Sequence, residues 1–194
     1  AGDIEAVVLT HAHLDHVGVG RPIGGDSIYN GAMDNAAGVA TLLELAASLR
    51  ESKTGLRRSL LFLAVTGEEK GLLGSKYFAA YPTVKPESLV ANLNVDMFLP
   101  IFPLRILTAY GLDESDLGAQ LRAVAETLGL RVQGDPEPNR NAFIRSDQYS
   151  FIRRGVPALA FKNGYEKGSP EAALFKKWLT ERYHAPGDDV DELL

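Results

Sequence analysis

The stretch "THAHLDHVG" (residues 10–18) places three of the chain's four histidines and an aspartate at the end of an apolar run. That run, "IEAVVLTH" (residues 4–11), is rich in β-branched and aliphatic residues, which is typical of a buried strand. In α/β proteins, polar side chains that directly follow such a strand gather at the carboxyl edge of the sheet, where ligands bind. The stretch therefore indicates an α/β fold with a ligand site at this edge.

Other segments of the chain alternate between strand and helix patterns. Short apolar runs predict further strands at residues 59–66, 89–97, 104–110 and 156–161. Apolar residues at helical spacing predict helices at residues 36–52, 71–81, 114–129 and 169–183. This alternation predicts an α/β fold with a central, mostly parallel or mixed β-sheet flanked by helices.

The composition is that of one folded globular domain. The chain has 194 residues, of which 45% are hydrophobic and 23% charged, and it has no cysteine for disulfides or thiolate metal sites. Its net charge of -5 without a long basic run argues against a nucleic-acid partner. No apolar stretch reaches the roughly 20 residues that cross a bilayer, and residues 1–10 lack the basic start of a signal peptide. We therefore expect no membrane partner, and the oligomeric state stays open.

Histidines and acidic residues follow the predicted strands at separate places in the chain. These residues are His13, Asp15, Glu68, Glu69, Asp96 and the pair Ser146 and Asp147. Asp34 stands at a predicted helix start, and His184 lies within "RYHAPGDD" (residues 182–189). Because imidazole and carboxylate groups are normal zinc ligands, the set predicts a zinc site.

Two families compete for the opening stretch. Taken alone, "HAHLDH" (residues 11–16) resembles the zinc-binding string of the metallo-β-lactamase fold. That family needs further histidines to complete its metal sites, and only His184 remains in this chain. The metallo-β-lactamase interpretation is therefore kept only as an alternative.

A longer, ordered set of motifs resembles the dizinc aminopeptidases, zinc metallopeptidases related to bacterial leucyl aminopeptidases, glutamate carboxypeptidase and glutaminyl cyclase. The motifs are "AHLDH" (12–16), "DNAAG" (34–38), "EEKGLLGS" (68–75), "NLNVDM" (92–97) and "RYHAPGDD" (182–189). The resemblance implies a three-layer α/β/α sandwich. It also implies that residues 1–194 are a single catalytic domain, a core without the family's N-terminal and C-terminal flanks, in a secreted or periplasmic protein.

The same resemblance implies two co-catalytic zinc ions. Asp34 would bridge them, His13 and Asp96 would complete one site, and Glu69 and His184 would complete the other. Two metal ions about 3.5 to 4 Å apart need such a bridging group.

Other residues take their expected roles from the family pattern. Glu68 and Asp15 are the expected catalytic residues, with Glu68 as the general base. Asp15 and Asp188 are expected to hold the second ring nitrogens of the metal-binding histidines. The family does not use His11 and His16 as ligands, so both are interpreted as structural.

The chain departs from the family pattern beside "RSDQYSF" (residues 145–151). Phe143 stands where several members use a tyrosine to hold the developing oxyanion, and Gln148 stands where histidine is common. Arg145 could replace the tyrosine or bind a substrate carboxylate. It could also be a surface residue paired with Asp147.

From these residues we expect a zinc-dependent exopeptidase, an aminopeptidase that hydrolyses N-terminal residues from peptides with a free amino terminus. A dipeptidase or carboxypeptidase of the same family is an alternative if Arg145 binds a substrate carboxylate. A non-catalytic binding domain with the same fold is an alternative of a different class.

Overall fold

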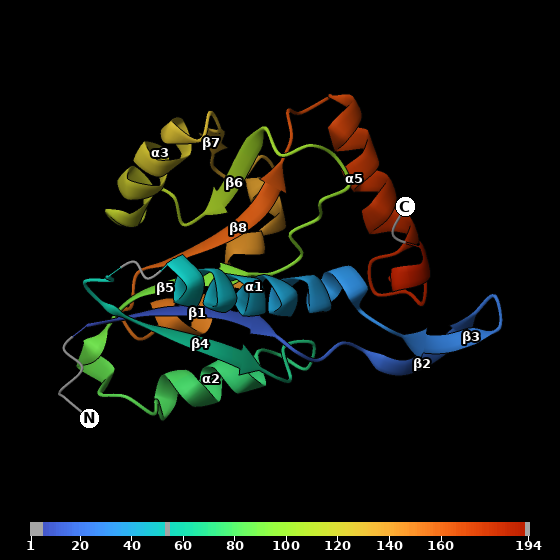
Figure 1. The fold of residues 1–194 in the computed structure, drawn as a ribbon. Coiled ribbons are helices and arrows are strands. Elements are labelled where there is room, and N and C mark those ends of the chain that lie inside the picture. Colours follow the sequence, from blue (N-terminus) through green and yellow to red (C-terminus); the bar gives the residue numbers. More distant parts are fainter. Residues whose placement is uncertain (1–5, 53–54, 193–194) are drawn as a thin grey trace.

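A mixed six-stranded sheet forms the centre of the molecule (Figure 1). The computed structural model describes residues 6–52 and 55–192. The strand order is β4-β1-β5-β8-β6-β7, and the pair β6 and β8 is antiparallel whereas the other pairs are parallel. The strands are β1 (Val7–His13), β4 (Ser59–Val65), β5 (Leu89–Val95), β6 (Ile106–Tyr110), β7 (Arg131–Gln133) and β8 (Ala158–Gly164).

Helices cover both faces of this sheet, as the sequence predicted. They are α1 (Ala37–Ser52), α2 (Leu73–Ala80), α3 (Leu117–Thr127), α4 (Gln148–Ile152) and α5 (Pro170–Glu181). The helix α1 crosses one face of β1, β4 and β5 (Figure 1), and α2 packs with α4 on the other face. The expected α/β fold with three layers is therefore confirmed.

Three strands were not predicted. Two of them, β2 (Gly18–Ile23) and β3 (Asp26–Tyr29), form an antiparallel hairpin that projects away from the sheet (Figure 1). Proline and several glycines in this segment are typical of a loop rather than of a strand. The third, β7, has only three residues, which is too short for a recognisable pattern. Residues 4 and 5 of the predicted first strand lie outside the described residues.

The parallel strands bring distant parts of the sequence to one edge. His13 ends β1 in register with Val65, the last residue of β4. The neighbouring strand β5 ends at Val95, one residue before Asp96. The carbonyl of Val95 accepts a hydrogen bond from the Asn35 amide at 2.9 Å, which joins the start of α1 to the end of β5.

The approach of α1 to β5 is very close. A Cβ atom at Gly38 would lie 2.5 Å from the Val95 carbonyl oxygen, so a glycine is required at this position. The side-chain oxygen of Asn35 also accepts hydrogen bonds from the backbone N–H groups of Gly38 and Met97.

Among the described residues, no helix is both long and apolar enough to cross a membrane.

The packing of β1 predicts that truncating one of its buried side chains lowers the free energy of unfolding substantially. Leu9 is fully buried and packs in a cluster with Phe78 of α2 and Phe151 of α4. We expect Leu9→Ala to lower the free energy of unfolding by about 3 kcal/mol, because it removes buried apolar contacts and leaves a cavity. The control is Leu43→Ala on the exposed side of α1, which should change the free energy of unfolding by less than about 0.5 kcal/mol. Urea titrations measure both changes. Equal effects of the two variants would contradict this assignment of the core.

Candidate metal centre

His13 lies at the centre of a buried group of donor atoms. Its Nε2 atom is 3.2 Å from Asp34 Oδ1 and 3.6 Å from Asp96 Oδ1. Its Nδ1 atom is 3.0 Å from the backbone carbonyl oxygen of Asp15, which can only accept, so Nδ1 carries a proton and donates it to this carbonyl. This contact fixes the ring with Nε2 facing the two carboxylates.

The His13 ring contacts Asp15, as the sequence predicts, but through the backbone carbonyl of Asp15. Asp15 holds the ring through its main chain, and its carboxylate oxygen is 3.9 Å from Nδ1. The same carboxylate oxygen accepts a hydrogen bond from the backbone N–H of Glu68 at 3.3 Å. Asp15 therefore links the end of β1 to the turn after β4.

A second group of donors lies on the other side of Asp34. His184 Nε2 is 3.3 Å from Asp34 Oδ2 and 3.1 Å from Glu69 Oε2. His16 Nδ1 is 3.0 Å from Glu69 Oε1 and 4.0 Å from Asp34 Oδ2. Burial by itself would raise the pKa of Glu69, but its contacts with His16 and His184 outweigh it and lower that pKa to about 2.

All five sequence-predicted ligands thus come together. His16, interpreted from the sequence as structural because the family pattern does not use it, lies beside two of the same carboxylates. Its position three residues after His13 is the local signal that it lies near this site.

The donor atoms fit a zinc ion in number, type and spacing. Two ligands of one zinc ion, each about 2.1 Å away at the tetrahedral angle, lie about 3.4 Å apart. The contacts of His13 and His184 with their carboxylates are close to this value. Several donors are also buried without a hydrogen-bond partner among the described residues: Glu69 Oε1, Asp96 Oδ1 and both ring nitrogens of His16. Such unpartnered buried atoms are rare and point to a cation.

The charged groups around His13 shift one another's pKa values. Burial by itself would lower the pKa of His13, but the close Asp34 and Asp96 carboxylates outweigh it and raise that pKa to about 12. Burial would raise the pKa of Asp96, but Lys162 and His13 hold it below its usual range. The Asp96 carboxylate therefore stays ionised and ready to bind a cation.

Glu68 and Glu69 point to different places because the chain turns after β4. The carbonyl of Glu68 accepts hydrogen bonds from the N–H groups of Gly71 and Leu72, both at 2.9 Å. Glu69 faces His184 in the second group of candidate metal ligands, while Glu68 lines the neighbouring cavity with Asp34 and Asp96. Burial and the nearby charge of Asp96 raise the pKa of Glu68 to about 8.

Asp188 has a different contact from the one predicted. Its carboxylate accepts hydrogen bonds from the backbone N–H groups of Met33 at 2.8 Å and Asp34 at 3.0 Å, rather than from the ring of His184. Its own carbonyl accepts from the N–H of Ala32. Asp188 therefore positions the segment that carries Asp34.

The structure shows the contacts of Gln148 and Arg145, the two residues at which the chain departs from the family pattern near α4. Gln148 is buried, accepts from the Asn94 amide at 2.7 Å and donates to the carbonyl of Phe143. Arg145 is exposed and lines the cavity, whereas Asp147 is buried. No ion pair joins these two residues in the part of the chain that the structure describes, so the alternative of a surface pair finds no support.

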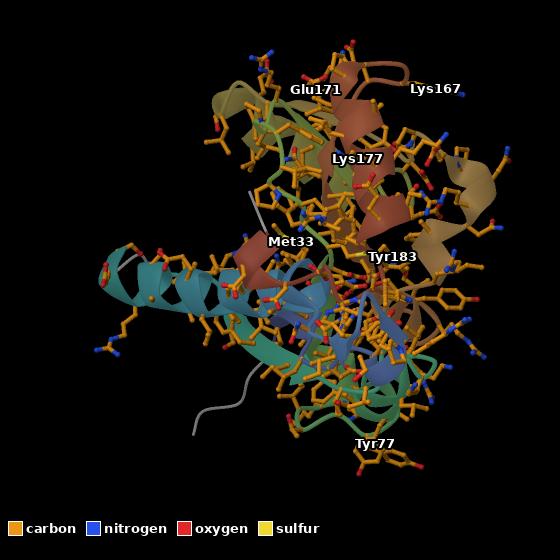
Figure 2. All side chains as sticks on the ribbon, turned by 90° about the vertical axis from the view of Figure 1, so that its right-hand side faces the viewer. Met33, Tyr77, Lys167, Glu171, Lys177 and Tyr183 are labelled. Atoms are coloured by element: carbon orange, nitrogen blue, oxygen red, sulfur yellow. The ribbon has the colours of Figure 1, made fainter. Side chains whose placement is uncertain are left out.

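The cavity beside the donors has walls from distant elements. Its lining includes Tyr110, Arg140, Arg145, Lys162, Tyr165 and Tyr183. Figure 2 looks onto the molecule from the side toward which the hairpin projects and shows Tyr183 at the end of α5, near the middle of the view. Sequence reasoning missed Lys162, whose ammonium is 3.8 Å from Asp96 Oδ1, because no local motif marks it.

The fold and these donors together are those of a metallopeptidase domain. The chain belongs to peptidase family M28, whose model matches residues 1–194. This match over the whole chain decides against the metallo-β-lactamase alternative.

The chain is also similar to named proteins. The chain is 29% identical over 205 residues to the "probable leucine aminopeptidase 2" of Aspergillus fumigatus, covering 99% of this chain and 38% of the relative. It is 29% identical over 200 residues to aminopeptidase Y of Saccharomyces cerevisiae, covering 99% and 33%. A zinc aminopeptidase of Bacillus subtilis has the same fold, with a TM-score of 0.69, 24% identity and coverage of 97% and 42%. The chain thus spans at most half the length of these proteins.

The contacts of Asp188 predict an effect on metal affinity. We expect Asp188→Ala to weaken zinc binding by about 10- to 100-fold, because the segment carrying Asp34 loses two hydrogen bonds that position it. Competition with a chromophoric chelator measures this change. The exposed Asp191→Ala should bind zinc as the unmodified protein does. Unchanged affinity in Asp188→Ala would mean that Asp34 is positioned by other contacts.

Proposed function

We propose that this chain is the catalytic domain of a zinc-dependent aminopeptidase that removes N-terminal residues from peptides with a free amino terminus. The observation that carries the proposal is the position of Asp34, with Oδ1 facing His13 and Oδ2 facing His184. A carboxylate that offers one oxygen to each of two donor groups suits a site with two metal ions. The aminopeptidase names of the relatives support the choice of substrate.

In this proposal each zinc ion has its own protein ligands. His13 and Asp96 would bind one ion, Glu69 and His184 the other, and Asp34 would bridge the two. When bound, two zinc ions lower the pKa of a shared water and polarise the scissile carbonyl group. Three carboxylates offset most of their four positive charges.

Glu68 is the proposed general base. It lines the cavity together with Asp34 and Asp96, and it is not among the metal-type donors. Its raised pKa, about 8, suits a carboxylate that accepts a proton near neutral pH and then releases it. Glu68 would take a proton from the attacking water and deliver it to the amine that leaves when the peptide bond breaks.

Arg145 supports a second candidate, an enzyme that binds the terminal carboxylate of a dipeptide or of a longer peptide. Its guanidinium lies on the cavity wall and is exposed, so it can reach a bound substrate. In the aminopeptidase, the same group would instead stabilise the oxyanion, because Phe143 offers no hydroxyl. Substrates with a blocked amino or carboxyl end separate these candidates.

Metal content and substrate choice test the proposal. We expect about two zinc ions per chain by elemental mass spectrometry, markedly fewer in Asp34→Ala, and no loss in the exposed carboxylate variant Glu126→Ala. Aminoacyl p-nitroanilides should be hydrolysed, and N-acetylation should abolish their hydrolysis. Activity that is lost on C-terminal amidation of peptides would favour the second candidate, and a metal-free, inactive protein would refute both.

The role of Glu68 makes a separate prediction. Glu68→Gln should retain the zinc content of the unmodified protein and lower kcat by about 100- to 10,000-fold, because the amide cannot accept the proton. Glu68→Asp, which keeps a carboxylate, should recover part of this loss. If Glu68→Gln keeps full activity, the proton acceptor is another group.

A further inference from the structure

We propose that His16 is a metal ligand, and that it binds through Nδ1 to the same ion as Glu69 and His184. The proposal rests on the proposed function, because it requires that the cluster holds metal. It assigns a role to the one histidine of this cluster that the family pattern leaves out.

The first argument is burial without a partner. The His16 side chain is 4% exposed, compared with 37% for His184. Both ring nitrogens of His16 are buried and lack a hydrogen-bond partner among the described residues. An imidazole carries at least one N–H donor, so leaving both nitrogens unsatisfied costs free energy that a metal bond at one of them would offset.

The second argument is the set of distances around the ring. Nδ1 of His16 is 3.0 Å from Glu69 Oε1, yet this oxygen also lacks a hydrogen bond of normal geometry. Two atoms that lie this close without donor and acceptor alignment fit two ligands of a common cation. Asp34 Oδ2 is 4.0 Å away, and the donor atoms of His16, Asp34 and Glu69 lie close enough together to hold a metal ion.

The third argument is that His16 and His184 share the same carboxylates. Glu69 faces His16 with Oε1 and His184 with Oε2, and Asp34 Oδ2 is near both rings. The two rings lie nearly edge to face, with centroids 5.4 Å apart. Both can therefore face one ion from adjacent directions.

The backbone leaves room for the His16 ring. Gly31 has a φ of 69°, and a Cβ atom there would lie 2.5 Å from Cγ and 2.6 Å from Cβ of His16. Any other residue at position 31 would displace the ring. Gly31 directly precedes the segment that carries Asp34, so the site of His16 is built by the same loop.

The consequence is an asymmetric centre. Four side chains would bind the ion on the Glu69 side, namely His16, Asp34, Glu69 and His184. Only His13, Asp34 and Asp96 would bind the other ion. Catalytic zinc sites keep an open position, so the ion held by His13, Asp34 and Asp96 would be the one with a place for the substrate.

A direct count of metal-bound histidines tests the proposal in the unmodified protein. The chain has four histidines, so the protein can be labelled with ¹⁵N-histidine, loaded with ¹¹³Cd and examined for ¹¹³Cd–¹⁵N couplings by NMR. We expect coupled nitrogens in His13, His16 and His184, with the His16 coupling at Nδ1. His11 is the internal control, because it is fully buried and its Nδ1 is 3.0 Å from the Asn92 amide.

Two variants assign the signals. His16→Gln should remove one coupling, retain those of His13 and His184, and weaken the binding of one of the two ions by at least about tenfold. His184→Gln should retain the His16 coupling. Couplings in His13 and His184 alone, in the unmodified protein, would overturn the role of His16 and leave the aminopeptidase proposal intact. No coupling in any histidine, together with no bound metal, would refute both proposals.

Discussion

The mutual repulsion of three buried carboxylates, Asp34, Glu69 and Asp96, is the constraint on which the rest of this structure depends. Such groups can be buried together only if cations or hydrogen-bond donors offset their charge. Three histidines and the ammonium of Lys162 surround them. A divalent cation on each side of Asp34 would meet the same requirement more fully, which is the physical basis for assigning metal-binding chemistry to this edge of the sheet.

The fold brings these carboxylates together by the ends of parallel strands and by hydrogen bonds on either side of Asp34, made by Asn35 and by Asp188. Parallel pairing of β4, β1 and β5 places the residues that follow them at one edge, and α1 begins there because Asn35 is bonded to the end of β5. On the other side, Asp188 holds the backbone of Asp34. The functional carboxylate is thus fixed by contacts to its neighbours in sequence, which leaves its own oxygens free for a ligand.

The central fold could be predicted from local patterns in the sequence, whereas the set of five proposed ligands came from the resemblance of five ordered motifs to the dizinc aminopeptidases. Buried strands have continuous apolar runs, and their ends carry the polar residues. Contacts that join distant elements left no such mark: Lys162 reaches Asp96 from β8, and the Asp188 carboxylate binds a backbone rather than a histidine. The proximity of His16 to Glu69 could not be predicted either, because it depends on how the turn after β4 meets the end of β1.

The place of His184 after α5 has a consequence for folding. Its ring contacts Glu69 and Asp34, which come from distant parts of the sequence. The backbone of His184 has a positive φ of 54°, and its ring is stacked on that of Tyr183. A cation held at this point acts as a reversible crosslink between α5 and the sheet. Since such a crosslink exists only in the folded chain, mass action ties the stability of this region to the concentration of free metal.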